Sequence, residues 1–294
     1  MTACLTFFVK TDDGLSLFVR DYVPGSPADE LPVICLHGLT RNSADFEEVA
    51  PMIAETGRRV ITMDMRGRGR SESDSNPANY RPDVYARDVI GVMNALNIPQ
   101  AVFIGTSMGG IITMLVAVMA PGRFAASVLN DIGPELDPSG LARIMAYVGK
   151  GKPLPSWESM VTAIRETQSK AFPNADNGFW HVFARRVARE LPDGRVEFAY
   201  DPKIALAFGT APAKPAPSMA PMFKALASKP VLVIRGALSD LLSPEGVLGM
   251  RAIKPDLFTA EVPGVGHAPT LEEPTAQRAL VEFLGRVGGP CSTR

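Results

Sequence analysis

The chain has 294 residues, of which 46% are hydrophobic and 21% are charged, and its formal net charge is −1. This composition is typical of a globular protein with one large core, or with one core and an inserted lobe. The balanced charge gives no attraction to nucleic acid or acidic membranes, and no apolar stretch reaches the roughly 20 residues needed to span a bilayer. We therefore expect neither a nucleic-acid nor a membrane partner; the sequence does not define the oligomeric state.

The amino-terminal residues and the cysteines predict a cytoplasmic location. Residues 1–14 lack a basic region followed by a long apolar run, so no secretory signal is expected. Cys4, Cys35 and Cys291 are far apart and form no C-x-x-C pair, which is typical of reduced thiols. No histidine pair or cysteine cluster has the spacing of metal ligands, so no metal site is expected.

The first part of the chain alternates strands with helices. In chain order we predict strands at 5–10 and 15–23 joined as a hairpin, a strand at 33–36, a helical patch through 46–53, a strand at 59–64, a helix at 82–96, and strands at 101–105 and 126–131. Pro51 is expected to break the helical patch and Gly57 to close it. Because the strands are almost continuously apolar, they predict a parallel α/β sheet covered on both faces.

The alternation stops after the strand at 126–131. Residues 133–229 show no convincing buried strand, and their apolar spacing predicts helices around 141–148, 157–164 and 180–187. Residues 211–221 are rich in proline and alanine and predict a return connection. Strands at 231–236 and 258–262 and a helix at 274–287 then complete the sheet. We therefore expect a core formed by 1–132 and 230–294, with 133–229 inserted between neighbouring strands.

The sharpest motif is Gly105-Thr106-Ser107-Met108-Gly109-Gly110, which lies between an apolar strand and an apolar helix. G-x-S-x-G in this position is the pattern of a nucleophile elbow. The turn requires a strained backbone at Ser107, and side chains at positions 105 and 109 would collide with neighbouring segments. The pattern therefore predicts Ser107 as a nucleophile at the carboxyl end of a strand.

Three histidines and two aspartates are candidates for its base and acid. His37 ends a strand and more plausibly shapes a loop, while His181 is assigned to the surface or to packing. His267 follows the last strand, where catalytic groups gather in open α/β sheets, and is the predicted general base. For the acid we prefer Asp240, in the loop after 231–236, because the order Ser…Asp…His is kept; Asp131, which ends its strand, is the competitor.

An oxyanion hole and a pocket complete the predicted site. The backbone N–H of Met108 is expected as one donor and that of Leu39 as the other, since Gly38 allows close approach of the backbone. The helices of the insertion are expected to contribute apolar side chains to the pocket. The candidate pocket residues are Met145, Trp180, Phe183 and Leu241.

The arginine-rich stretch Met65-Arg66-Gly67-Arg68-Gly69-Arg70 could suggest nucleic-acid binding. In a chain of balanced charge, without aromatic residues in the stretch, a solvated loop is the better interpretation. A dinucleotide-binding loop is also excluded, because Glu72 occupies the position of the third glycine. No cofactor is expected.

Taken together, these residues resemble the α/β-hydrolase superfamily over essentially the whole chain. The matching motifs are Leu36-His37-Gly38-Leu39, Asp64-Met65-Arg66-Gly67-Arg68-Gly69-Arg70-Ser71, Gly105-Thr106-Ser107-Met108-Gly109-Gly110, the Ser239-Asp240 loop and Gly266-His267-Ala268-Pro269. The resemblance implies an eight-stranded, mostly parallel sheet with helices on both faces, and residues 133–229 as a helical cap over the serine.

At two positions this sequence differs from particular branches of the superfamily, and these differences restrict the reactions that we expect. Its epoxide hydrolases and haloalkane dehalogenases use a carboxylate nucleophile, whereas position 107 is serine. Carbon–carbon bond hydrolases of this superfamily often carry tryptophan after the histidine, and Ala268 at that position counts against that branch. The elbow also resembles those of cofactor-free haloperoxidases and lactonases. We expect a serine hydrolase of a small, largely apolar ester or lactone. A carbon–carbon bond hydrolase of ring-fission products and a non-catalytic small-molecule-binding module are the alternatives.

Overall fold

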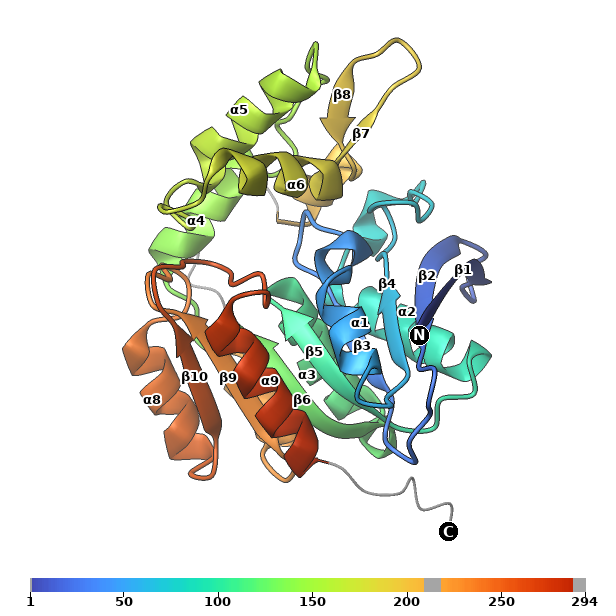
Figure 1. The fold of residues 1–294 in the computed structure, drawn as a ribbon, viewed down its shortest axis with the longest axis vertical. Helices are drawn as coiled ribbons and strands as arrows, with labels where there is room; N and C mark the ends of the chain where they lie inside the picture. The colour runs from blue at the N-terminus through green and yellow to red at the C-terminus, as the bar shows by residue number, and fades with distance from the viewer. Residues whose placement is uncertain (1, 209–217, 288–294) are drawn as a thin grey trace.

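The computed structural model describes residues 2–208 and 218–287, and its centre is an eight-stranded sheet (Figure 1). The strands lie in the order β1-β2-β4-β3-β5-β6-β9-β10. Their bounds are β1 (Ala3–Lys10), β2 (Ser16–Val23), β3 (Val33–Leu36), β4 (Val60–Met63), β5 (Ala101–Thr106), β6 (Phe124–Asn130), β9 (Val231–Gly236) and β10 (Phe258–Val262).

Most of the sheet is parallel, as the sequence predicted. β1 pairs with β2 as an antiparallel hairpin and β2 pairs antiparallel with β4, while every other pairing in the sheet is parallel. The four residues of β3 and the four of β4 are all buried, which is what their continuous apolar runs indicate. β6 and β9 are neighbours, so the segment between them leaves the sheet and returns beside its own starting point.

Helices cover both faces of the sheet, and each face has its own hydrophobic core. One core joins the sheet to α2 (Pro82–Ala95), α3 (Met108–Met119), α7 (Ala220–Leu226) and α8 (Pro244–Ile253). The other joins it to α1 (Val49–Ala54) and α9 (Pro274–Arg286). α3 has no polar face because it lies between the sheet and α2, as its uniformly apolar sequence predicts.

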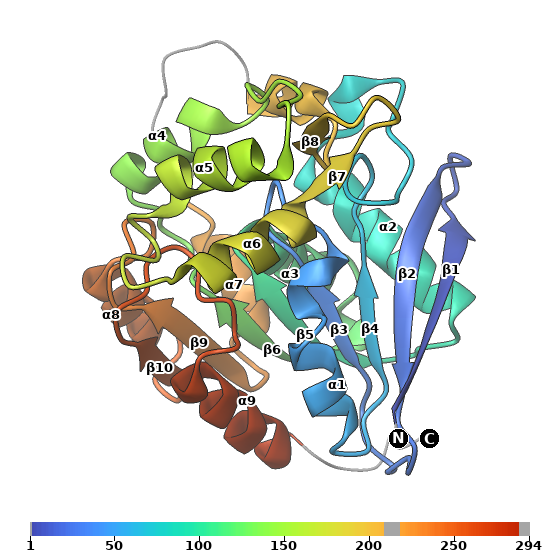
Figure 2. The same ribbon diagram turned by 45° about the horizontal axis from the view of Figure 1, so that its top comes forward.

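The segment between β6 and α7 stands above one end of the sheet, and we call residues 133–208 the cap segment (Figure 2). It contains α4 (Pro138–Tyr147), α5 (Trp157–Gln168), α6 (Asn177–Val187), the strands β7 (Ala188–Glu190) and β8 (Val196–Phe198), and the 3₁₀ helix η4 (Pro202–Phe208). α5, α6 and the β7–β8 hairpin share a small core of their own around Met160 and Trp180.

Three local predictions differ from the structure. Pro51 lies inside α1 rather than breaking it, because it is the third helical residue, whose N–H has no partner within the helix. The β7–β8 hairpin was not predicted, since its strands have only three residues each. The predicted connection at 211–221 lies largely outside the described residues, as does Cys291, but Ala220 and Pro221 begin α7, which packs against α3.

The arginine-rich loop after β4 is not solvated, so that prediction is wrong for two of its arginines. Arg66 and Arg68 are each only 1% exposed. Arg66 is paired with three carboxylates, with donor–acceptor distances of 2.6 Å to Asp74, 2.6 Å to Asp88 and 2.7 Å to Asp13. Its hydrogen bonds to Asp13 hold the pKa of that carboxyl group at about 2. A buried charge is tolerated when it is paired and hydrogen-bonded in this way.

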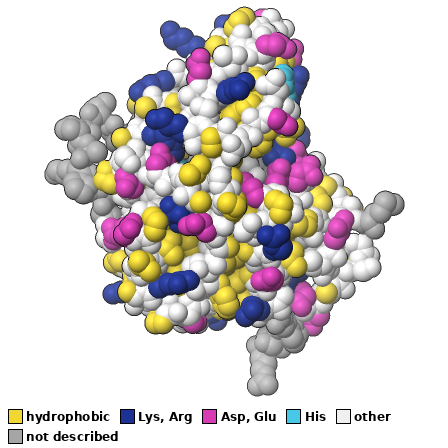
Figure 3. Space-filling view, turned by 60° about the vertical axis from the view of Figure 1, so that its left-hand side comes forward, with side chains coloured by type: hydrophobic (Ala, Val, Ile, Leu, Met, Phe, Trp, Pro, Cys, Tyr) yellow, Lys and Arg dark blue, Asp and Glu magenta, His cyan; other side chains and the backbone are white. Residues whose placement is uncertain are grey.

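Basic and acidic side chains are interspersed on the face shown in Figure 3, with apolar side chains between them. This distribution agrees with the formal net charge of −1. Among the described residues, no helix is long and apolar enough to cross a membrane.

We expect Arg66→Met to lower the free energy of unfolding by about 3–5 kcal/mol, because Asp74 and Asp88 would remain buried without their cationic partner. Urea denaturation followed by circular dichroism measures this change. Arg81→Met is the control: the Arg81–Asp83 pair is exposed, and its loss should have little effect. Similar midpoints for Arg66→Met and the wild type would contradict the prediction.

Candidate active site

Ser107 lies on a sharp turn between β5 and α3, as the nucleophile-elbow pattern predicts. Its φ of 52° and ψ of −114° are unusual for a residue with a side chain. A Cβ on Gly105 would overlap the Gly109 carbonyl oxygen, and one on Gly109 would overlap the Leu36 carbonyl oxygen. Glycine at both positions therefore lets α3 start close against β3 and β5.

The loop after β10 places the imidazole of His267 beside this serine. His267 Nε2 lies 2.9 Å from Ser107 Oγ, which is the distance of a hydrogen bond in which the hydroxyl donates to the ring nitrogen. The Gly266 N–H donates to the Ala171 carbonyl of the cap segment at 2.7 Å, which fixes the loop just before the histidine. The structure thus joins two residues that are 160 positions apart in the sequence.

The carboxylate that contacts His267 belongs to Asp131, not to Asp240, so the preferred prediction for this contact is wrong. Asp131 Oδ2 lies 2.8 Å from His267 Nδ1. The Asp131 carboxylate is fully buried and also accepts hydrogen bonds from the Gly236 N–H at 2.8 Å and the Ser239 hydroxyl at 2.6 Å. Because the ionised Asp131 carboxylate can only accept, His267 donates from Nδ1, and this tautomer leaves Nε2 free to accept from the Ser107 hydroxyl.

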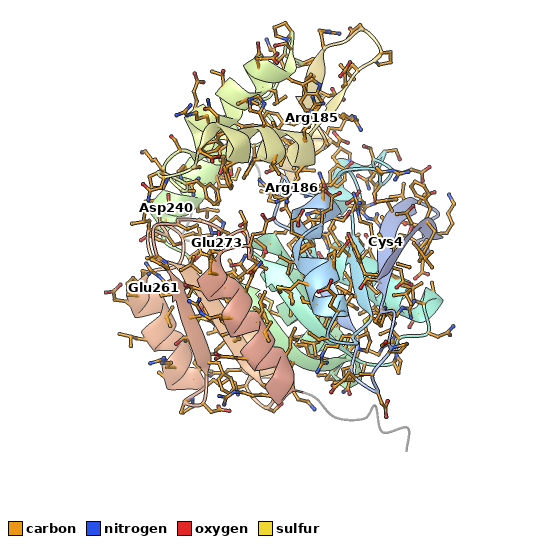
Figure 4. The ribbon with its side chains drawn as sticks, viewed as in Figure 1. Cys4, Arg185, Arg186, Asp240, Glu261 and Glu273 are labelled. Atoms are coloured by element: carbon orange, nitrogen blue, oxygen red, sulfur yellow. The ribbon has the colours of Figure 1, made fainter. Side chains whose placement is uncertain are left out.

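Asp240 instead forms an ion pair with the cap segment. Its two carboxylate oxygens accept hydrogen bonds from Arg143 of α4, at 2.5 Å from Nε and 2.8 Å from Nη2. The hydrogen bond from Arg143 holds the pKa of Asp240 below its usual value. Figure 4 shows Asp240 at the top of the β9 end of the sheet, under α4. Order along the chain does not separate the two aspartates, because both lie between Ser107 and His267.

The backbone N–H groups of Leu39 and Met108 are among those near Ser107 that have no hydrogen-bond acceptor in the described residues. Met108 is the first residue of α3, so its N–H has no partner within the helix and carries the positive end of the helix dipole. Leu39 follows Gly38, and a Cβ on Gly38 would lie 3.9 Å from Ser107 Cβ. These are the two groups that the sequence predicts as oxyanion donors, and that role stays a prediction.

His37 has the loop-shaping position that its sequence context predicts. It is fully buried, its Nδ1 donates to the Gly38 carbonyl at 2.7 Å, and its Nε2 accepts from the Met65 N–H at 3.0 Å. These bonds require the neutral ring, and burial lowers the pKa of His37 accordingly. His181 is exposed on α6 and does not line the cavity beside Ser107.

A cavity of about 520 Å³ lies between the sheet and the cap segment and reaches Ser107 and His267. Phe183 and Leu241 line it, as predicted, whereas Met145 and Trp180 are not among its lining residues. Trp180 is instead only 1% exposed and packs edge-on against Phe172 and Phe179 inside the cap segment. Further lining residues, which the sequence did not indicate, include Ile111, Leu136, Leu141, Ile144, Tyr147 and Phe198.

The cap segment contacts the core around this cavity. Arg186 of α6 pairs with Glu272 at 2.5 Å, and the Arg186 carbonyl accepts a hydrogen bond from Asn42 at 2.6 Å. In Figure 4, Arg186 lies on the side of α6 that faces the sheet. Burial raises the pKa of Glu272, although its Arg186 partner opposes that effect. Within the described ranges, no group of three or more histidine, cysteine, aspartate or glutamate residues is arranged to hold a metal ion.

Comparison with known proteins agrees with this architecture. The chain matches the family described as alpha/beta hydrolase fold over residues 32–274. It is 35% identical over 267 residues to a 3-hydroxybutyrate-oligomer hydrolase from Cupriavidus necator, covering 88% of this chain and 90% of that one. It is 27% identical over 263 residues to a 2-(acetamidomethylene)succinate hydrolase from Mesorhizobium japonicum, covering 86% and 87%.

Among solved structures, the chain is similar to an alpha/beta hydrolase from Novosphingobium aromaticivorans, with a TM-score of 0.88 and 40% identity over 97% of this chain and 99% of that one. The agreement of the family match, the curated relatives and the sheet topology assigns the fold and the general activity. The chain belongs to the alpha/beta hydrolase family and is a hydrolase.

Proposed function

We propose that the protein is a serine hydrolase of carboxylic esters, including lactones, and that it acts through an acyl-enzyme. The observation that carries the proposal is the hydrogen-bonded row Ser107 Oγ, His267 and Asp131, with heavy-atom distances of 2.9 Å and 2.8 Å. A hydroxyl, an imidazole and a buried carboxylate in this order are the functional groups of a Ser-His-Asp triad.

In the proposed reaction, Ser107 Oγ attacks the ester carbonyl carbon while His267 Nε2 takes the hydroxyl proton. The resulting imidazolium is stabilised by the Asp131 carboxylate, which also fixes the ring orientation. Collapse of the tetrahedral intermediate releases the alcohol, which takes the proton from His267. Water then attacks the acyl-enzyme with the same histidine as base, and the acid leaves.

The negative oxygen of each tetrahedral intermediate is proposed to lie against the N–H groups of Leu39 and Met108. Both groups lack acceptors among the described residues, so they are available to donate. The cavity beside Ser107 gives room for a small substrate with an apolar part, since Leu136, Ile144 and Phe183 are among its lining residues. We infer that residues 133–208 act as a cap over this cavity.

The proposed substrate class rests on the name of one relative. A 3-hydroxybutyrate oligomer is joined by ester bonds, so the name of the 35% identical relative supports an ester of a short hydroxy acid. Ala268 after the histidine gives no such support for carbon–carbon bond cleavage. We therefore place short aliphatic esters, lactones and hydroxybutyrate dimers first among the substrates to test.

A fluorophosphonate probe tests the nucleophile directly. We expect the wild type to be labelled once per chain at Ser107, because the probe traps an activated serine as a stable adduct, and Ser107→Ala to remain unlabelled. Intact-protein mass spectrometry and peptide mapping locate the adduct. An unlabelled wild type, or labelling that persists in Ser107→Ala, would favour a small-molecule-binding module instead.

Loss of the base should lower turnover strongly. We expect His267→Ala to reduce kcat for p-nitrophenyl butyrate by on the order of 10³-fold or more, since no other imidazole or carboxylate is hydrogen-bonded to Ser107 among the described residues. His181→Ala is the matched control, because that histidine is exposed on α6 and should leave the rate unchanged. Near-normal turnover in His267→Ala would remove this residue from the mechanism.

Replacement of Asp131 should lower kcat strongly, whereas replacement of Asp240 should not. Asp131→Asn keeps the shape but removes the charge beside His267 Nδ1, and we expect a fall in kcat of at least about 10²-fold with KM little changed. Asp240→Asn removes only an ion pair with Arg143 and should keep kcat within about threefold. Steady-state kinetics of both variants decide the assignment. Loss of activity in Asp240→Asn alone would reverse it.

A further inference from the structure

Arg68 is a buried cation that has no role in the reaction proposed above. It belongs to the loop after β4 and is only 1% exposed. Its Nε donates to the Leu39 carbonyl at 3.0 Å, and its Nη1 donates to the Arg66 carbonyl and the Tyr85 hydroxyl, both at 2.8 Å. Its Nη2 lies 3.8 Å from Met108 Sδ. Every acceptor of this guanidinium is therefore uncharged.

No carboxylate forms an ion pair with Arg68 anywhere in residues 2–208 and 218–287. The contrast with Arg66, two positions earlier, is direct, because Arg66 is equally buried and is paired with three carboxylates. Removing a charged group from water without an opposite charge costs stability. Because no carboxylate pairs with it directly, this positive charge remains available to a negative charge that appears during the reaction.

The contacts of Arg68 point to the site of that negative charge. Leu39 and Met108 carry the two unpaired N–H groups of the proposed oxyanion hole, and the guanidinium contacts both of these residues. Leu39 comes from the loop after β3 and Met108 from the start of α3, so Arg68 is a single side chain that connects two separate elements. Arg68 is not among the residues that line the cavity, which means that it acts through its neighbours rather than by touching substrate.

We propose that Arg68 is a positioning residue of the oxyanion hole, whose unneutralised charge also favours the tetrahedral intermediate. This inference rests on the proposed function. Its hydrogen bond to the Leu39 carbonyl restrains the loop that carries the Leu39 N–H, and its contact with Met108 Sδ packs the guanidinium against the first residue of α3. Its positive charge, in surroundings of low polarity, interacts favourably with the negative oxygen that appears only during the reaction. Both effects favour the transition state over the bound ester and so raise kcat rather than lower KM.

The surroundings of Arg68 make this arrangement rigid and partly compensate the buried charge. Its guanidinium carbon lies 4.8 Å from the ring centroid of Tyr85 and 5.6 Å from that of Tyr80, within the range of cation–π attraction. The flanking backbone pairs with the cap segment: the Gly69 N–H donates to the Ala199 carbonyl at 2.7 Å, and the Asp201 N–H donates to the Gly67 carbonyl at 2.8 Å. The loop is therefore held on both sides of Arg68.

The test compares Arg68→Met, which removes the charge and the donors, with Arg68→Lys, which keeps a charge but not the planar fork. For p-nitrophenyl butyrate we expect kcat to fall between about 10-fold and 100-fold in Arg68→Met and about fivefold or more in Arg68→Lys, with KM within about threefold of wild type. The inhibition constant of a butylboronic acid, which forms a tetrahedral anionic adduct with serine, should rise by a factor similar to the loss in kcat. The inhibition constant of butanol, which forms no adduct, should stay unchanged.

Arg58→Met is the matched control for loss of a buried arginine. Arg58 lies just before β4, at the opposite end of that strand from Arg68, and is 3% exposed. It donates to the Leu31 and Leu284 carbonyls and pairs with Glu30 at 2.7 Å. We expect this variant to lose thermal stability while keeping kcat and the boronic-acid affinity within about threefold of wild type. The Arg58→Met variant shows whether the loss of stability that follows removal of a buried arginine is enough to change kcat and the boronic-acid affinity.

Each outcome decides the proposal. Parallel losses of kcat and boronic-acid affinity in the folded Arg68 variants support it, and values within threefold of wild type in both variants overturn it. If Arg68→Met does not fold, as judged by circular dichroism, the result for Arg68→Lys decides alone. A wild-type enzyme that forms no adduct at Ser107 overturns the proposed function and this inference with it, whereas a wild-type adduct with unaffected Arg68 variants overturns this inference only.

Discussion

The site depends on one buried carboxylate, that of Asp131 at the end of β6. Its oxygens accept hydrogen bonds from the Gly236 N–H, the Ser239 hydroxyl and His267 Nδ1, so the charge is satisfied on every side despite complete burial. These donors come from β9, from the loop after it and from the loop after β10. The carboxylate therefore fixes His267 relative to the sheet, and β5, the neighbour of β6, carries Ser107 within reach of the imidazole.

Much of the nucleophile's geometry could be predicted from sequence because it depends on local sterics. Gly105 and Gly109 each face a backbone carbonyl that a Cβ would overlap, so the residue types themselves report the close packing of β5, α3 and β3. The almost continuously apolar strands likewise predict a parallel sheet that is covered by helices on both faces. His267 could be selected because its position after the last strand restricts it to the edge where Ser107 lies.

The acid could not be selected in the same way, since Asp131 and Asp240 both end or follow a strand and both precede His267. The two aspartates differ in how far each lies beyond the end of its strand. Asp131 directly follows β6, and its N–H still donates to the Ile234 carbonyl of β9, whereas Asp240 lies four residues beyond the end of β9 and turns toward α4. The position of Arg143 on the cap segment gives Asp240 its own partner, and no local sequence signal predicts that contact. Trp180 shows the same limitation: its apolar character predicts burial but not whether it faces the cavity or the cap segment's own core.

The two buried arginines show why the charge of a loop does not predict its exposure. Arg66 and Arg68 have the same residue type and neighbouring positions, yet one is surrounded by Asp13, Asp74 and Asp88 and the other by carbonyls, aromatic rings and a thioether. The carboxylates are supplied by the β1–β2 turn, by the arginines' own loop and by α2, so only the folded chain brings them to Arg66. Arg68 receives none, and its guanidinium instead contacts the Leu39 carbonyl and the Met108 thioether.

The cap segment and the site are mechanically connected, because each main contact between cap and core is made to a loop that carries a site residue. Arg143 binds the loop after β9 through Asp240, and Ser239 of that loop donates to Asp131. The cap backbone at 199–201 binds the loop that holds Arg68. Individual partly exposed ion pairs contribute about 0–1 kcal/mol, so no single contact holds the cap in place. Ser239 and Asp240 are thus neighbours with different contacts, because the Ser239 hydroxyl donates to Asp131 whereas the Asp240 carboxylate pairs with the cap segment.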